Sequence, residues 1–246
     1  MDERYEEWVG AVRAGRFDRA WQISDALLHE RAARGGSKHD GPRAQQQIWR
    51  GEPFDGARVL LRCYHGLGDT IQFIRFAPQL RARARELIVW CQPELLDLIA
   101  GVRGVDRVLP LHDGAPNVAY DVDVESMELP HALRVADDVG RAVPYLRAGI
   151  EPHGGREDEV HVGIVWQAGD WGQTRSAPLD ALAPLTQVPG VRLHALHPGA
   201  VTGGLPIGDL STARIDRLAA RMRGLDLIVS VDTMAAHLAG ALGLRV

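Results

Sequence analysis

The segment Arg58-Val-Leu-Leu-Arg-Cys-Tyr64, followed directly by His65-Gly-Leu-Gly-Asp-Thr70, indicates the fold class. Residues 58–64 are largely apolar and have the length of a buried strand, and residues 70–83 carry apolar side chains at helical spacing. The glycines and polar residues between them are typical of a turn from a strand into a helix. A strand that leads into a helix in this way predicts an α/β fold with a parallel sheet.

The same alternation continues toward the C-terminus and restarts after a Gly- and Pro-containing break at residues 151–156. Strands are expected at residues 86–91, 105–111, 119–124, 160–166, 191–196 and 225–231, and helices at 93–100, 178–185, 211–223 and 233–242. Strand–helix–strand units place their strands parallel, with helices covering the sheet. The pattern therefore predicts an α/β protein with two Rossmann-like, doubly wound domains.

Two helices are expected before this alternation begins. Apolar residues recur at helical spacing through residues 5–33, and Gly15 interrupts them, which indicates a helical hairpin. Residues 15–20 resemble the turn of a tetratricopeptide repeat, but a single copy indicates a capping hairpin instead. Gly, Ser, Pro and charged residues between 32 and 53 indicate a linker. We expect a hairpin and linker at 1–50, a first Rossmann-like domain at 51–155 and a second at 156–246.

The second domain is expected to be C-terminally incomplete. It has only three complete expected strands, and Leu244-Arg-Val246 has the character of the opening of a fourth. A sheet edge that breaks off there would leave backbone N–H and C=O groups unpaired. We expect either a shortened form with a loosened second domain or a sheet completed by another chain, as a homo-oligomer or with a second chain.

Composition and charge exclude several classes of protein. The 246 residues include 28 basic and 32 acidic side chains, for a net charge of −4, without the basic patch of a nucleic-acid-binding protein. The longest apolar runs are shorter than the roughly 20 residues of a membrane span, and the N-terminus is acidic rather than signal-like. Cys63 and Cys91 lie in apolar runs without metal-ligand spacing, which indicates reduced, buried thiols. We expect a cytoplasmic protein with no transmembrane segment and no nucleic-acid partner.

The loop after residues 58–64 is the first of three candidate sites, because open parallel sheets bind ligands at the carboxyl ends of their strands. Gly66 and Gly68 permit close backbone approach, and Asp69 is placed to act as a general base toward an acceptor hydroxyl. His65 is adjacent and is a second catalytic candidate. The alternatives are that Asp69 is only a helix cap and that His65 is an ordinary surface histidine.

The second loop, Ser230-Val-Asp-Thr233, leads from a strand into the last expected helix. A helix N-terminus after a parallel strand offers unpaired N–H donors and a partial positive charge, which suit a pyrophosphate. Asp232 and Thr233 are natural caps, and His237 follows Thr233 by four residues on the same helix face. The alternative is a capped core helix with His237 packed against the sheet.

The third loop spans residues 167–178. Loops of this length and glycine content are often functional, and Arg175 is a candidate for binding phosphate oxygens, with a solvated arginine as the alternative. Asp121, Asp123 and Glu125 alternate along an expected strand and so share one face. Their chemistry suits a hard cation, but without a converging loop signature we expect a water-exposed strand edge.

Three segments together resemble glycosyltransferase family 9, the heptosyltransferase-like enzymes, and most of all the members fused to tetratricopeptide repeats. They are residues 62–78, Gly163-Ile-Val-Trp-Gln167 and residues 230–242, which occur in the family's order and spacing. The resemblance covers about residues 56–246. It implies a GT-B architecture, in which the first domain mainly holds the acceptor and the second the nucleotide-sugar. It also implies inversion at the anomeric carbon, with no cofactor besides the nucleotide-diphosphate sugar as co-substrate and no required metal.

The resemblance also implies roles for single residues. Asp69 matches the glycine-loop aspartate of the family, the expected base, and Arg175 lies where the family has a basic residue near the phosphates. Residues 232–234 and His237 match the donor-phosphate motif. The expected catalytic residues are Asp69 and His65, and the expected substrate-binding residues are Gly66, Gly68, Thr70, Gln72, Arg175, Asp232, Thr233, Met234 and His237.

The sequence departs from the family pattern at three places. His65 stands where many relatives have Glu, and His197-Pro-Gly follows the expected strand at 191–196 in place of a Gln-Lys type of continuation. The family also continues past the 230–242 motif with another strand and helix. We expect an inverting glycosyltransferase that acts on a glycan, lipid-linked or protein acceptor. The alternative is a non-catalytic sugar- or protein-binding module that keeps the fold.

Overall fold

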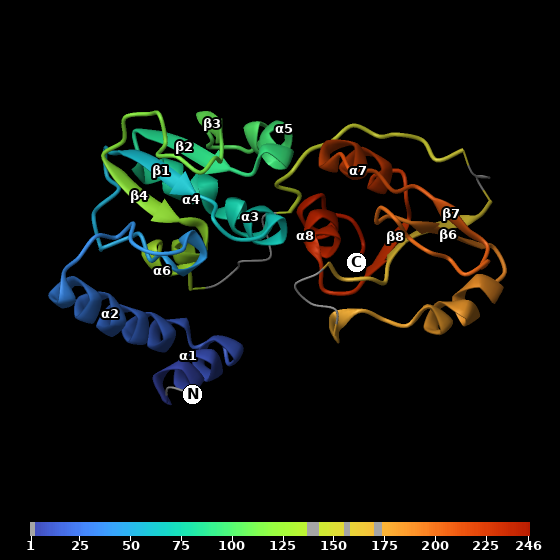
Figure 1. Cartoon of the computed structure of the whole chain (residues 1–246), viewed down its shortest axis with the longest axis horizontal. Coiled ribbons are helices and arrows are strands. Elements are labelled where there is room, and N and C mark those ends of the chain that lie inside the picture. Colours follow the sequence, from blue (N-terminus) through green and yellow to red (C-terminus); the bar gives the residue numbers. More distant parts are fainter. Residues whose placement is uncertain (1–2, 137–142, 155–157, 170–173) are drawn as a thin grey trace. The chain divides into compact units, whose positions relative to one another are not determined.

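The computed structural model describes residues 3–136, 143–154, 158–169 and 174–246. These residues form two compact units, each with a parallel four-stranded sheet (Figure 1). The first unit is drawn from Met1–His65, Phe73–Cys91 and Arg103–Ala142, and the second from Gly66–Gln72, Gln92–Val102 and Val143–Val246. The expected α/β fold with two parallel sheets is therefore confirmed.

The sheet of the first unit has the strand order β3-β2-β1-β4. Its strands are β1 (Arg58–Arg62), β2 (Glu86–Cys91), β3 (Arg107–Pro110) and β4 (Val122–Glu125). The central strand β1 pairs in parallel with β2 and β4, and its Leu60 and Leu61 are fully buried. Its continuous apolar run is thus the pattern of a strand that is covered on both faces.

The helix expected at residues 70–83 begins earlier and is interrupted. It starts as α3 (Leu67–Phe73), continues as a 3-10 turn and resumes as α4 (Ala77–Arg83). Pro78 explains the break, because proline has no N–H for the helix ladder and its ring clashes with the carbonyl four residues earlier. Asp69 consequently lies inside the first helical turn instead of ahead of it. Two short helices, α5 (Leu96–Ala100) and α6 (Leu129–Ala132), each follow a 3-10 turn.

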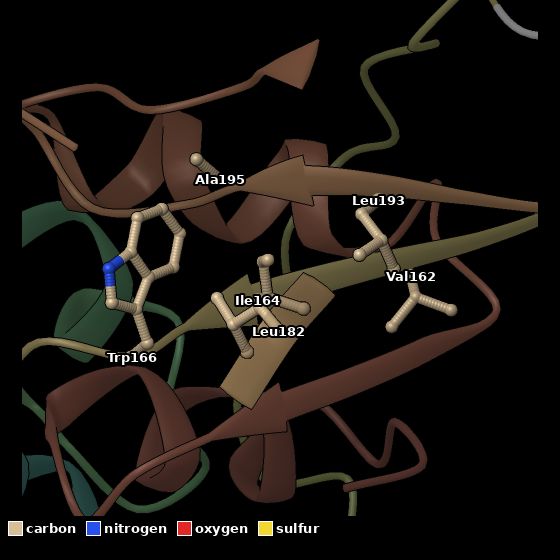
Figure 2. Close-up of a cluster of buried hydrophobic side chains, with 6 residues drawn as sticks. All are labelled: Val162, Ile164, Trp166, Leu182, Leu193 and Ala195. Atoms are coloured by element: carbon tan, nitrogen blue, oxygen red, sulfur yellow. The ribbon is translucent and has the colours of Figure 1, made fainter. Parts of the chain in front are cut away.

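The sheet of the second unit has the order β7-β6-β5-β8. Its strands are β5 (Val160–Val165), β6 (Val191–Ala195), β7 (Ile207–Asp209) and β8 (Leu227–Ser230), with helices α7 (Ile215–Met222) and α8 (Met234–Ala241). The helix expected at 178–185 is a 3-10 segment, Leu179–Gln187, with Pro184 inside it. Figure 2 shows one cluster of the core of this unit, formed by Val162, Ile164, Trp166, Leu182, Leu193 and Ala195.

The expectation of only three complete strands in this sheet is wrong. Strand β7 is the fourth, and its three residues are too short to produce a recognisable alternation in the sequence. Residues 244–246 are not a strand, but the backbone N–H of Ile228 in β8 donates to the carbonyl of Arg245 at 2.9 Å. The last residues therefore make one backbone bond to the edge strand β8.

The N-terminal hairpin is confirmed as α1 (Glu3–Arg13) and α2 (Phe17–Arg34). Gly15 lies between the helices with φ of +67°, a conformation that glycine adopts without strain. Trp21 is buried between the helices, and its indole N–H donates to the carbonyl of Val135 at 2.8 Å. The hairpin is therefore anchored to the first unit. No helix within the described residues combines the length and the hydropathy that crossing a bilayer requires.

Candidate functional site

His65 and Glu125 meet where β1 and β4 end. The Nδ1 atom of His65 lies 3.1 Å from Oε1 of Glu125, which is 1% exposed. The same carboxylate accepts from the hydroxyl of Ser126 at 2.9 Å and from the backbone N–H of Met127 at 2.7 Å. An ionised carboxylate only accepts, so a neutral imidazole in this contact carries its proton on Nδ1. The carboxylate therefore sets the orientation and the tautomer of His65.

The expectation of a water-exposed edge at residues 121–125 is wrong for two of its three acidic residues. Asp123 is 0% exposed, and it accepts from Nε of Arg62 at 2.8 Å and pairs with Nζ of Lys38 at 2.6 Å. Only Asp121 is exposed, in an ion pair with Arg58. The linker lays Lys38 over the strand, which no local pattern could indicate. With two cationic partners, Asp123 has its charge neutralised within the protein.

The guanidinium of Arg62 lies among aromatic rings. The Cζ atom of Arg62 lies 5.7 Å from the ring centre of Tyr64, 5.4 Å from that of Trp90 and 5.5 Å from that of Tyr120. Its nitrogens also donate to the hydroxyls of Tyr64 and Tyr120. Cation–π contacts and hydrogen bonds together satisfy a buried cation, so we assign this cluster a structural role.

The glycine loop, residues 66–69, and the rest of α3 up to Gln72 belong to the second unit. Oδ2 of Asp69 accepts from the backbone N–H of Gly66 at 2.9 Å, the bond by which a residue in the first turn closes a helix start. Thr70 is buried and donates to Oε1 of Gln92 at 2.9 Å, so its hydroxyl anchors the loop. Gln72 is partly buried one residue before the end of α3. The structure gives Asp69 a capping contact and leaves its catalytic role a prediction.

Gly68 brings the start of α3 close to α8. A Cβ atom at Gly68 would lie 2.9 Å from Cδ2 of His237 and 3.5 Å from Cα of Met234. A side chain there would collide with the imidazole, so glycine is required for this approach. The structure thus brings together three of the expected substrate-binding residues, Gly68, Met234 and His237.

The start of α8 gathers most of the expected donor-phosphate motif. Nη1 of Arg175 donates to Oδ2 of Asp232 at 2.7 Å and to its carbonyl at 3.0 Å, and Nε2 of His237 lies 4.0 Å from Oδ1 of the same residue. Thr233 is at the N-cap position, but its side chain makes no capping bond and instead lies 3.0 Å from the hydroxyl of Ser230. Of the third expected loop, residues 170–173 lie outside the described residues.

A pocket of about 410 Å³ opens at the carboxyl ends of β5, β6 and β8. Its lining includes Val165, Gln167, Leu196, His197, Thr233 and Met234, together with Leu67 at the start of α3. In open parallel sheets this edge is the usual place for a ligand. The two helix N-termini, of α3 and α8, both contribute residues to it.

His197 and Gln167 are pocket residues that were not among the expected site residues. Nε2 of His197 lies 3.1 Å from Oε1 of Gln167. The His197 ring packs edge to face against Trp166, with the two ring centres 4.3 Å apart. Burial lowers the pKa of His197, which favours the neutral imidazole. Gln167 lies two residues after the end of β5 and His197 two residues after the end of β6, so the rule that selected the other loops would also have selected them.

No protein-family model matches the sequence, and no curated protein matches it. Solved structures do resemble it. The glycosyl transferase family 9 protein from Veillonella parvula aligns with a TM-score of 0.60 at 12% identity, over 78% of this chain and 81% of that one. ADP-heptose LPS heptosyltransferase II from E. coli aligns with a TM-score of 0.54 at 14% identity, over 76% of this chain and 82% of that one.

A third similar structure is the dodecameric iron-containing heptosyltransferase TibC in complex with ADP-D-β-D-heptose. It aligns with a TM-score of 0.54 at 12% identity, and the match covers 78% of this chain and 58% of TibC. At such low identity the likeness concerns the fold alone. The two parallel sheets are therefore GT-B-like, with structural similarity to glycosyltransferase family 9 and the heptosyltransferases.

Proposed function

We propose that this chain is a glycosyltransferase that transfers a sugar from a nucleoside-diphosphate sugar to an acceptor hydroxyl with inversion. The observation that carries the proposal is the pocket at the carboxyl ends of β5, β6 and β8, into which the start of α8 contributes Thr233 and Met234. A helix N-terminus at that edge of a parallel sheet suits an anionic group. The GT-B-like fold supports the proposal but does not establish it.

The donor diphosphate is assigned to the start of α8. Its first backbone N–H groups and partial positive charge face the negative phosphates, and the side chain of Thr233 does not occupy those donors as a cap. Arg175 and His237 add cationic or hydrogen-bonding contacts near Asp232. A bound diphosphate competes with Asp232 for the exposed guanidinium of Arg175, which can donate hydrogen bonds to two oxygens at once.

Asp69 is assigned the role of general base. It takes the proton of the acceptor hydroxyl, whose oxygen attacks the anomeric carbon from the face opposite the leaving group. The bond between that carbon and the phosphate oxygen breaks, and the nucleoside diphosphate leaves with the electron pair, stabilised at the start of α8. His65, held by Glu125, is assigned the orientation of the acceptor hydroxyl.

The nucleotide and the sugar are best approached through the similar structures. TibC is in complex with ADP-D-β-D-heptose, and the E. coli protein is an ADP-heptose heptosyltransferase. We therefore propose ADP-heptose as the first donor to test, with a glycan, lipid-linked or protein hydroxyl as acceptor class.

The test is release of ADP from ADP-heptose by the purified full chain, with and without pooled lipid-linked glycan acceptors, measured by a coupled assay for ADP. The expected result is ADP release that rises with acceptor and is about 10²-fold slower or more when Asp69→Asn replaces the wild type. Binding of ADP-heptose by calorimetry without any ADP release would contradict the enzymatic proposal and support the sugar-binding module. UDP- and GDP-sugars serve as controls for the nucleotide.

A further inference from the structure

Three histidines cluster in the second unit apart from the pocket described above. They are His153 in the segment before β5, His161 in β5 and His194 in β6. One ring nitrogen from each lies within 4.8 Å of one from each of the others. We propose that His153, His161 and His194 bind a Zn²⁺ ion.

The strand register explains why two of these side chains face each other. His161 pairs with Arg192 across the parallel strands β5 and β6, so His194, two residues further along β6, lies on the same face. Nδ1 of His161 and Nε2 of His194 are 2.9 Å apart. Two imidazole nitrogens on one tetrahedral zinc lie about 3.3 Å apart, so this pair needs to separate by only a few tenths of an ångström.

The ring positions also fit a shared ion. The centre of the His194 ring lies 5.2 Å from that of His161 and 5.6 Å from that of His153. With Zn–N bonds of about 2.0–2.1 Å in tetrahedral geometry, two ligand rings have their centres about 5 Å apart. The ring centres of His153 and His161 are closer, at 3.9 Å with the planes tilted by 33°, so these two rings must move apart when the ion enters.

The segment that carries His153 is anchored independently of the histidines. The backbone N–H of Glu151 donates to the carbonyl of Ala220 at 2.9 Å, and its carboxylate accepts from Arg217 at 2.9 Å and Arg221 at 3.0 Å, all in α7. The third ligand is therefore held near the sheet before any ion binds. Preorganised ligands of this kind raise metal affinity.

Space for an entering ion and a further ligand lies beside the rings. A Cβ atom at Gly208 in β7 would come within 3.0 Å of Nδ1 of His194, so glycine makes room for this ring. An open cavity of about 340 Å³ is lined by His153, His194, Glu159 and Asp209 among others. Water or one of these carboxylates can complete a four-coordinate site. An all-imidazole set of three suits zinc and other divalent ions of intermediate softness.

The experiment titrates the untagged full chain, stripped with a chelator, with ZnCl₂ by calorimetry and with CoCl₂ by visible absorption. We expect one zinc ion per chain, a four-coordinate cobalt spectrum and a higher melting temperature with zinc. His194→Gln and His153→Gln are each expected to lower zinc affinity by about 100-fold or more, because each removes a ligand. His29→Gln changes an exposed histidine of α2 and should leave the affinity unchanged.

His153→Gln lies outside the sheet, so it carries the test if His194→Gln does not fold by circular dichroism. Absence of zinc binding to the wild type would overturn the proposal. So would equal affinity of the wild type and the folded ligand variants, or an equal loss in His29→Gln. In those cases His161 and His194 are a hydrogen-bonded pair of the core and nothing more.

Discussion

Asp69, in the first turn of α3, and Glu125, the last residue of β4, are carboxylates with different surroundings. The buried Glu125 accepts bonds from Ser126 and Met127 besides its histidine contact. Asp69 is partly buried and accepts one backbone bond, from Gly66. A carboxylate has about four lone-pair sites, so Asp69 retains acceptor capacity toward a substrate hydroxyl. The contacts thus favour Asp69 over Glu125 as the base.

Replacement of Asp69 by Asn is expected to lower turnover by about 10²-fold or more, because the amide cannot take the proton of the acceptor. The amide oxygen can still accept from Gly66, so the fold and ADP binding should be preserved. Steady-state kinetics and calorimetry measure the two effects. The exposed Asp40→Asn is the matched control. Unchanged turnover in the Asp69 variant would remove it from the catalytic assignment.

Glu128 gives a pH dependence of stability. Burial raises its pKa to about 7, although the backbone N–H groups of Trp49 and Glu125 donate to it. Between its ordinary value and pH 7 the folded state therefore binds more protons than the unfolded state, and stability falls as pH rises. This decrease in the free energy of unfolding is at most about 3 kcal/mol, and we expect it to be absent in Glu128→Gln.

Urea unfolding at pH 5 and pH 8 measures this effect. The wild type is expected to be less stable at pH 8 by a margin that Glu128→Gln lacks. Glu30→Gln, at a largely exposed ion pair with Arg4, should keep the pH dependence of the wild type. An equal dependence in the wild type and Glu128→Gln would show that Glu128 titrates normally in the folded state.

At the scale of elements, α3 and α8 determine the candidate site. Helix α3 follows the loop after β1, and α8 follows the loop after β8. Both helices contribute their first residues to the pocket of the second unit. Gly68 lets the start of α3 approach His237. Pro78 then ends the regular helix, so α3 is only seven residues long. The short helix α3 therefore reaches the pocket through its first turn only.

Thr233→Ala and His237→Ala should each weaken binding of a nucleoside diphosphate by about ten-fold, or about 1.4 kcal/mol. Because the Thr233 side chain makes no capping bond, its loss should leave α8 intact. Calorimetric titration with ADP measures the affinity, and His29→Ala is the control. Full affinity in both variants would argue against a phosphate site at this helix.

At the scale of the whole molecule, each unit has its own sheet and core, and the N-terminal hairpin belongs to the first unit. Trp21 joins α2 to residues after α6 through its bond to Val135. Asp25 of α2 also accepts from Arg134 at 2.6 Å and lies 2.9 Å from Nε2 of His131. The hairpin is therefore a packed part of the fold.

Trp21→Ala is expected to lower the free energy of unfolding of the first unit by about 3–5 kcal/mol, the usual effect of emptying a large buried site. The carbonyl of Val135 also loses its donor. Urea unfolding followed by circular dichroism measures the change, and the exposed Gln22→Ala is the control. A loss below about 0.5 kcal/mol would show that the hairpin contributes little to the stability of this unit.

Much of the architecture could be predicted from the sequence, because strands, helices and their turns depend on residues close together in the chain. Periodicity indicates the strand at residues 58–64, and the caps at its start indicate the helix α8. The backbone freedom of glycine indicates the break at Gly15. The parallel sheets follow from the alternation of these elements. The loops after the strands could likewise be singled out as candidate sites.

Which side chains meet depends on how distant segments pack against one another. Lys38 covers Asp123 from a linker 85 residues away, so an acidic strand that reads as exposed is buried. Strand β7 joins its sheet through three residues that pair with β6. His161 and His194 are 33 residues apart in the chain and become neighbours through the same sheet. Such contacts depend on distant segments, whereas periodicity reports only how each segment divides its own surface between core and water.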